Sequence, residues 1–210
     1  MQSPSSEFDA ILFDVGGVLL TNGWDHIERA TVYAHFNLGL DDVAAIEARH
    51  PKPYDLLERD QITFEEYLGE VVFFAPRPFT PEEFLNAVKP QSKKLPDSAL
   101  GILGQVAASG NWVVGVLNNE SRTLHEYRMI HFGLGRHLDL QLSSCYLGLR
   151  KPEPAIYKRA LDILGCKAHQ VVFIDDRATN TAAAAAEGMH AIQFQGEAQL
   201  RDTLQHLGIL

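Results

Sequence analysis

Short apolar runs recur along the chain and alternate with segments whose apolar positions repeat every three to four residues. The short runs are nearly continuous in apolar character, which is typical of strands buried on both faces of a parallel sheet. The predicted strands are residues 10–14, 113–117, 138–142, 171–175 and 190–194. The predicted helices between and after them are residues 98–108, 121–132, 153–164, 178–187 and 197–206. This alternation predicts an α/β fold with a doubly wound, mainly parallel sheet.

One segment between the first two strands breaks the alternation. From about residue 24 to residue 94 the pattern is helical, and no buried strand is indicated. Helices are predicted over residues 26–37, 41–50, 63–73 and 81–89, with Thr63 and Thr80 as N-caps. We therefore expect a small helical subdomain, residues 21–94, inserted into an α/β core made of residues 1–20 and 95–210.

Composition and charge narrow the class of protein. The 210 residues are 46% hydrophobic and 21% charged, which is close to the globular average and excludes wholesale disorder. The formal charge of −9 argues against nonspecific binding to nucleic acid or to an anionic membrane. The first residues lack the pattern of a signal peptide, and no apolar run approaches the length of a membrane span, so we expect a cytoplasmic protein. Cys145 and Cys166 are too few for a disulfide framework.

Polar and charged residues stand where the predicted strands end, and this is the edge at which open α/β sheets bind ligands. Asp175 and Asp176 are adjacent, so their carboxylates repel each other unless a cation or hydrogen bonds offset the charge. The remaining members of the set are Asp14, Asn118, Asn119, Arg150 and Lys151.

These residues have the chemical properties that phosphoryl transfer requires. Asp14 is a competent nucleophile when a metal ion and a lysine reduce its repulsion from phosphate. The carboxylates of Asp14 and Asp176 are hard oxygen ligands suited to Mg²⁺, and Lys151 supplies positive charge. Asn118 offers an amide donor, and the glycine pair 16–17 lets backbone N–H groups turn towards an anion.

Four sequence blocks carry a family resemblance. The blocks ILFDVGGVLL, VGVLNNES, LRKPEPAIY and VVFIDDRATN resemble, in order and spacing, the four motifs of the haloacid dehalogenase (HAD) superfamily of hydrolases. The helical insert matches the position of the helical C1 cap of that superfamily. Within it, LERDQITFEEYL is similar to the cap of small sugar-phosphatase-like members and of epoxide hydrolase N-terminal domains. The resemblance implies a Rossmann-like core with a small inserted cap.

The resemblance also implies roles for individual residues. Asp14 would become phosphorylated, and Lys151 would orient the nucleophile and the phosphate. Mg²⁺ would be bound by Asp14, the Gly16 carbonyl and Asp176, with Asp175 in support. Phosphate contacts are expected from Gly17, Asn118, Asn119 and Lys151.

The sequence departs from the family pattern at two positions. Most phosphatases of the superfamily have a second Asp two residues after the nucleophile, and this Asp protonates the leaving group. Gly16 stands at that position, so water or a cap residue would have to supply the proton. The second motif usually has Ser or Thr before its Asn, where this chain has Asn118, whose amide can still donate to phosphate.

Three functions are compatible with these features. The first is a Mg²⁺-dependent phosphatase that acts on a small phosphorylated metabolite through a phospho-aspartate at Asp14. The second is a catalytically weak or inactive regulatory module that binds phosphate. The third, least favoured, is a metal-free dehalogenase-type hydrolase, because such enzymes lack an acidic pair like Asp175 and Asp176. Trp24, which follows the first strand and its flap, is the cap residue expected to contribute to substrate specificity.

Overall fold

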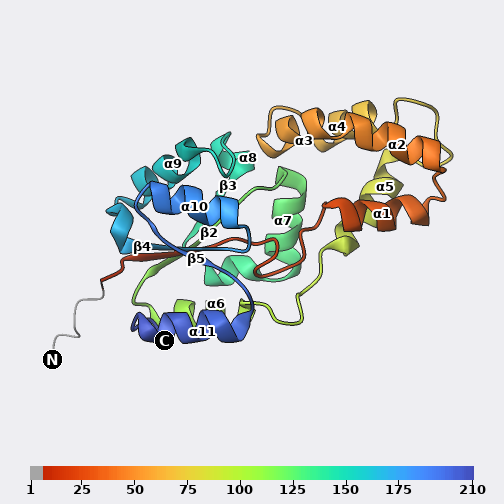
Figure 1. The fold of residues 1–210 in the computed structure, drawn as a ribbon. Coiled ribbons are helices and arrows are strands. Elements are labelled where there is room, and N and C mark those ends of the chain that lie inside the picture. Colours follow the sequence, from red (N-terminus) through yellow and green to blue (C-terminus); the bar gives the residue numbers. More distant parts are fainter. Residues whose placement is uncertain (1–6) are drawn as a thin grey trace.

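The sheet at the centre of the molecule has five parallel strands. The computed structural model describes residues 7–210 (Figure 1). The strands are β1 (Ala10–Phe13), β2 (Val113–Asn118), β3 (Leu140–Ser143), β4 (Val171–Asp175) and β5 (His190–Gln193). Their order in the sheet is β3-β2-β1-β4-β5, and every pair of neighbours is parallel. The predicted doubly wound, Rossmann-like α/β fold is confirmed, with the chain reversing its direction of winding beside β1.

Helices cover both faces of this sheet because its strands are apolar on both sides. Along β1, Ile11 and Phe13 join one hydrophobic cluster, and Ala10 and Leu12 join another. The first cluster packs against α6 (Leu100–Ser109) and α11 (Glu197–His206). The second packs against α9 (Pro154–Leu164) and α10 (Ala178–Ala186), on the opposite side of the sheet in Figure 1. The core also contains α7 (Arg122–His131), α8 (Ser144–Leu147) and the 3₁₀ turns η2 (Leu134–His137) and η3 (Ala168–Gln170).

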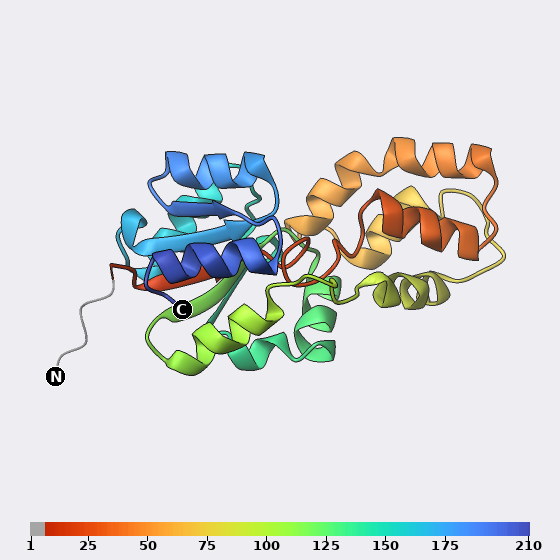
Figure 2. The same ribbon diagram turned by 60° about the horizontal axis from the view of Figure 1, so that its bottom comes forward.

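The helical insert forms a separate layer with its own hydrophobic cluster. Its elements are α1 (His26–His35), α2 (Leu40–Arg49), α3 (Pro51–Glu58), α4 (Phe64–Val71), α5 (Pro81–Val88) and η1 (Lys89–Gln91). Trp24, Tyr67 and Phe84 lie at the centre of this cluster and are at most 1% exposed. Figure 2 shows the insert, which we call the cap, beside the core and joined to it by two crossing segments.

The two crossing segments run side by side. Leu20 bridges Lys94 in antiparallel fashion, and the Thr21 N–H donates to the Lys93 carbonyl at 2.8 Å. The predicted division into residues 1–20 with 95–210 and residues 21–94 stays a prediction, and both of its limits fall at this pairing. Within residues 7–210, no helix is both long and apolar enough to cross a membrane.

Most element boundaries agree with the sequence patterns. Two helices, α3 and α8, were not predicted from them. Thr63 and Thr80 cap α4 and α5 as predicted, each in a reciprocal capping box. The helix α3 was not predicted, because Pro51 and Pro53 are normally helix breakers. In α3 Pro51 occupies the first helical position, where its missing N–H has no partner to lose. The single-turn helix α8 was also missed, since four residues are too few for a periodic pattern.

Candidate active site

Asp14 and Lys151 meet at the carboxyl edge of the sheet. Asp14 directly follows β1, and its N–H donates to the Ile174 carbonyl at 2.8 Å, which fixes it beside β4. Lys151 lies in the loop before α9 and is 4% exposed. Its Nζ contacts Asp14 Oδ1 at 2.9 Å and Asp175 Oδ2 at 2.6 Å. The ammonium group thus bridges two carboxylates from adjacent strands, as the strand order requires.

Asp175 is fully buried and saturated with hydrogen bonds. Besides Lys151, its carboxylate accepts a bond from the Arg177 N–H at 2.8 Å and bonds from Asn180 Nδ2 at 3.0 Å. These contacts make Asp175 a support for Lys151 and for the first turn of α10.

The buried charges shift the ionisation of their neighbours. Burial raises the pKa of Asp14 to about 7, against the opposing charge of Lys151. Burial also raises the pKa of Asp176, and the adjacent Asp175 carboxylate raises it further. For Lys151 burial alone would lower the pKa, but the two carboxylates outweigh it and raise the pKa above its usual value. The site therefore carries more negative charge than Lys151 offsets, which favours a cation.

The acidic residues fit a divalent metal ion. Carboxylate oxygens of Asp14, Asp175 and Asp176 lie within 4.8 Å of one another. Asp176 Oδ1 is buried, and within residues 7–210 it has no hydrogen-bond partner. A buried carboxylate oxygen without a donor is suited to a hard cation such as Mg²⁺. Asp176 is therefore a better candidate ligand than the saturated Asp175.

Gly17 makes room for Asp176. A Cβ at Gly17 would lie 2.3 Å from Asp176 Oδ2, and the backbone there has φ +74°. The Gly17 N–H donates to the Leu20 carbonyl at 2.7 Å, and the phosphate contact expected of Gly17 stays a prediction. The Gly17 N–H is therefore used in a hydrogen bond within the loop after β1.

Gly16 lines the site, and a side chain at this position would meet Asn22. A Cβ at Gly16 would lie 2.8 Å from Asn22 Oδ1. The Asn22 amide oxygen would therefore lie too close to the first atom of a side chain at position 16 unless it moved. Asn22 Nδ2 in turn donates to Asp25 Oδ2 at 3.4 Å.

The two asparagines after β2 have different surroundings. Asn118 is 1% exposed, and neither side-chain polar atom has a hydrogen-bond partner within the described residues. Asn119 accepts a bond from the Lys151 N–H at 2.8 Å and donates to the Lys151 carbonyl at 2.9 Å. Asn119 thus holds the loop that carries Lys151, while the amide of Asn118 is unpaired within the described residues, and its contact with phosphate stays a prediction.

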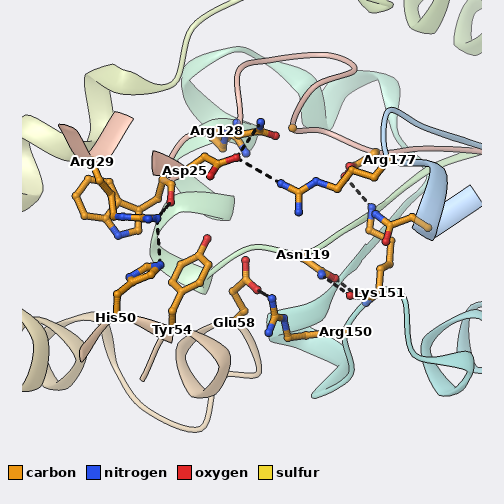
Figure 3. Close-up of a pocket in the computed structure, with 15 residues that line it drawn as sticks. Asp25, Arg29, His50, Tyr54, Glu58, Asn119, Arg128, Arg150, Lys151 and Arg177 are labelled. Carbon is orange, nitrogen blue, oxygen red and sulfur yellow. Dashed lines mark hydrogen bonds and ion pairs between the residues drawn. The ribbon is translucent and has the colours of Figure 1, made fainter. Parts of the chain in front are cut away.

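A cavity of about 270 Å³ lies between the core and the cap (Figure 3). The core side contributes Asp14, Lys151 and Arg177, among others. Sequence reasoning did not single out several of the residues that reach the cavity from the cap and its hinge, because their sequence separation from Asp14 hides their proximity. These residues are Asp25, Arg29, Tyr54 and Glu58. For Glu58 a signal existed, since it lies in the block LERDQITFEEYL.

Trp24 borders the cavity but faces the interior of the cap. Its side chain is 1% exposed, and its indole Nε1 donates to Tyr67 Oη at 2.9 Å. The ring packs edge-on against Tyr33 and Phe84. The polar atom of Trp24 is therefore already engaged, and its role in specificity stays a prediction that depends on the shape of the cavity wall.

Known proteins resemble this chain in sequence and in fold. The family model of haloacid dehalogenase-like hydrolases matches residues 8–188. Flavin mononucleotide hydrolase 1 of Arabidopsis thaliana is 28% identical over 198 residues, which cover 91% of this chain and 78% of that protein. Bifunctional epoxide hydrolase 2 of Rattus norvegicus is 46% identical over 59 residues, which are 28% of this chain but only 11% of that enzyme.

A solved structure has the same fold. It is a HAD family enzyme from Bacteroides thetaiotaomicron in complex with magnesium and inorganic phosphate, 19% identical and with a TM-score of 0.74. The likeness covers 90% of this chain and 95% of the other. With a family model matching most of its length and the acidic site at the expected strand ends, this chain belongs to the haloacid dehalogenase-like hydrolases.

Proposed function

We propose that this hydrolase is a Mg²⁺-dependent phosphatase that acts on a small phosphorylated metabolite through a phospho-aspartate at Asp14. The observation that carries the proposal is the contact of Lys151 Nζ with Asp14 Oδ1 at 2.9 Å beside the unpartnered Oδ1 of Asp176. A nucleophilic carboxylate, a fixed positive charge and an unsatisfied metal ligand are the parts that phosphoryl transfer requires.

Each residue has a defined part in the proposed reaction. Asp14 attacks phosphorus, the bond to the leaving-group oxygen breaks, and water later cleaves the acyl phosphate and restores Asp14. Lys151 holds Asp14 in place and offsets charge on the phosphoryl oxygens, and Asn118 offers an amide donor to them. Asp14, Asp176 and the Gly16 carbonyl would hold Mg²⁺, which, when bound, neutralises charge between carboxylate and phosphate.

The relatives support this reaction class. Flavin mononucleotide, named as the substrate of the Arabidopsis relative, is a phosphate monoester. The Bacteroides enzyme of the same fold was crystallised with magnesium and inorganic phosphate. The polar lining of the cavity, with Arg150, Lys151 and Arg177 on the core side, suits a small anionic substrate.

A second candidate function rests on the surroundings of Gly16. Because Asn22 borders the position where related phosphatases have an acid, a regulatory module that binds phosphate with negligible turnover is the alternative. The two functions differ in whether phosphate is released from substrate.

The test is hydrolysis of 4-nitrophenyl phosphate with Mg²⁺ and with EDTA. We expect turnover that requires Mg²⁺ and that Asp14→Asn abolishes, because an amide cannot attack phosphorus. Beryllofluoride should give a ¹⁹F NMR signal in the parent protein and none in Asp14→Asn. Asp9→Asn, which removes an exposed carboxylate at the start of β1, is the control and should keep full activity. Substantial activity in Asp14→Asn would exclude the covalent mechanism, and binding of phosphate without turnover in the parent would favour the regulatory function.

A further inference from the structure

A buried carboxyl group of the cap points into the active-site cavity. Glu58 is the last residue of α3, is 3% exposed, and lines the cavity together with Asp14. Figure 3 shows its side chain directed from α3 into the cavity, between Tyr54 and Arg150. Its carbonyl accepts a hydrogen bond from Ser144 Oγ in the core at 2.7 Å. This bond fixes the end of α3, and with it the Glu58 side chain, against the core.

The chemistry of the site leaves a role for such a group. Gly16 has no side chain to protonate a leaving group, and Asn22 borders that position. Among residues 7–210, the carboxyl groups that line the cavity are those of Asp14, Asp25 and Glu58. Asp14 is the proposed nucleophile, which leaves two carboxyl groups that could transfer a proton.

Asp25 is unsuited to donate a proton. Its Oδ1 accepts a bond from the His26 N–H at 2.7 Å, and its Oδ2 contacts Asn22 and, at 3.5 Å, Arg177. Partial burial raises the pKa of Asp25, but these hydrogen bonds and the Arg177 charge outweigh it and lower the pKa. Asp25 therefore stays ionised at neutral pH, and Glu58 is the remaining acid.

We propose that Glu58 is the general acid of this enzyme and replaces the acidic side chain that Gly16 lacks. The inference rests on the proposed phosphatase function. As Asp14 forms its bond to phosphorus, the proton of the Glu58 carboxyl passes to the ester oxygen and the bond between phosphorus and that oxygen breaks. The resulting Glu58 carboxylate then takes a proton from the water that cleaves the phospho-aspartate, which restores both residues.

The surroundings of Glu58 suit a group that gives up and regains a proton. Arg150 Nη2 lies 2.6 Å from Glu58 Oε2 and stabilises the carboxylate once the proton has left. Burial raises the pKa of Glu58 and, although Arg150, Tyr54 and Arg177 oppose this effect, the net shift is upward. Asp55 adds to the increase, and Glu120 in the core also interacts electrostatically with Glu58.

The test compares substrates whose leaving groups differ in their need for a proton. We expect Glu58→Gln to lower kcat/KM for alkyl phosphates by about 10²–10⁴-fold, the usual contribution of general acid catalysis. For 4-nitrophenyl phosphate, whose leaving group departs readily as an anion, the loss should be far smaller, within about threefold. A plot of log kcat/KM against leaving-group pKa should therefore be much steeper in Glu58→Gln than in the parent. We compare kcat/KM because it reports the steps up to release of the leaving group and does not depend on the later hydrolysis of the phospho-aspartate.

Asp55→Asn is the matched control, because Asp55 is the other carboxylate that contacts Arg150. This variant should keep the slope of the parent, and thermal unfolding should show that both variants are folded. An equal loss of kcat/KM for all substrates in Glu58→Gln, or no loss, would overturn the inference and leave the phosphatase function standing. If Glu58→Gln does not fold, Glu58→Asp replaces it. The proposal would be contradicted if Glu58→Asp kept both the parent's slope of log kcat/KM against leaving-group pKa and the upper limb of its pH profile for an alkyl phosphate. A parent protein without phosphatase activity would instead refute the function on which the inference rests.

Discussion

Two adjacent glycines in the loop after β1 meet different constraints. At Gly17 the backbone is left-handed and the missing Cβ leaves room for the Asp176 carboxylate. At Gly16 no left-handed backbone is present, and the limit is the Asn22 amide 2.8 Å from where a Cβ would lie. The loop thus gives the candidate metal ligand its space at one glycine, whereas at the other the Asn22 side chain would have to move to admit a Cβ.

Gly17→Ala should therefore abolish metal binding. The same substitution at another glycine with a left-handed backbone should leave metal binding unchanged. Gly165 has φ +67°, and a Cβ there would meet nothing within 4 Å. Both substitutions cost about 1–2 kcal/mol for the left-handed backbone, but only Gly17→Ala displaces Asp176. Calorimetric titration with Mg²⁺ should show affinity lost in Gly17→Ala and kept in Gly165→Ala. Equal Mg²⁺ affinity in the two variants would contradict this role of Gly17.

Among the elements, α2, α3 and α4 are tied together by one buried histidine. His50 stands between α2 and α3 and is 7% exposed. Its Nδ1 lies 2.7 Å from Tyr67 Oη on α4, and its Nε2 lies 3.1 Å from Arg29 Nη1 on α1. Because arginine only donates, Nε2 must accept, and the proton of the neutral ring must be on Nδ1. The packing of the cap therefore requires an uncharged imidazole.

The stability of the cap should consequently fall in acid. Burial, together with the charge of Arg29, lowers the pKa of His50 to about 4 from an ordinary value of 6.5. Because the folded-state pKa is depressed, this stabilisation is complete above pH 6.5 and is lost as pH falls towards 4. At about 1.4 kcal/mol for each pKa unit, the loss is at most roughly 3 kcal/mol.

Urea unfolding at pH 7 and at pH 4.5 measures this effect. His50→Gln should be less stable than the parent at pH 7, and the difference should shrink at pH 4.5. His35→Gln, at an exposed position of α1, is the control and should follow the parent at both pH values. A gap between His50→Gln and the parent that is the same at both pH values would contradict the neutral state assigned to His50. The pKa of His125 in the core is also lowered, but His125 is present in the parent and in both variants and so does not affect their comparison.

At the scale of the whole molecule, ion pairs join the cap to the core around the cavity. Arg150 pairs with Asp55 and also contacts the Glu58 carboxyl group, and Arg122 pairs with Asp60 at 2.6 Å. Further contacts link Arg59 to Glu153 and Arg177 to Asp25. In four of these contacts an arginine of the core meets an acid of the cap or its hinge, and most of the side chains are partly exposed. Each such pair contributes little alone, so their number and placement orient the cap over the site.

Binding of Mg²⁺ should stabilise the whole chain, since the site joins the ends of β1 and β4. At a Mg²⁺ concentration of 100 times Kd the gain is about 2.7 kcal/mol, which for a domain of this size raises Tm by roughly 5–11 °C. Asp176→Asn removes one ligand charge and should abolish most of the increase, while Asp162→Asn, at an exposed position of α9, should keep it. Differential scanning calorimetry across a Mg²⁺ titration measures the increase. An identical increase in Asp176→Asn would show that Mg²⁺ binds elsewhere.

The strands and the acidic edge of the sheet could be predicted from the sequence because they depend on local patterns. A continuous apolar run must be buried on both faces, and parallel strands bring their carboxyl ends to one edge. Asp14, Lys151, Asp175 and Asp176 could therefore be placed together without coordinates, and the structure brings them within contact of one another. The helical insert followed in the same way from its periodicity.

Only the tertiary structure decided which polar atoms are free and which are already bonded. Asp175 is saturated by Lys151, Arg177 and Asn180, whereas Asp176 keeps an unpartnered oxygen, although the two are neighbours in sequence. The arrival of Glu58 beside the cavity depends on α3 packing against the core, across 44 residues of chain from Asp14 (58 − 14 = 44). Local patterns identify which side chains are polar, but hydrogen-bond partners and burial depend on contacts between distant segments, which exist only once the chain has folded.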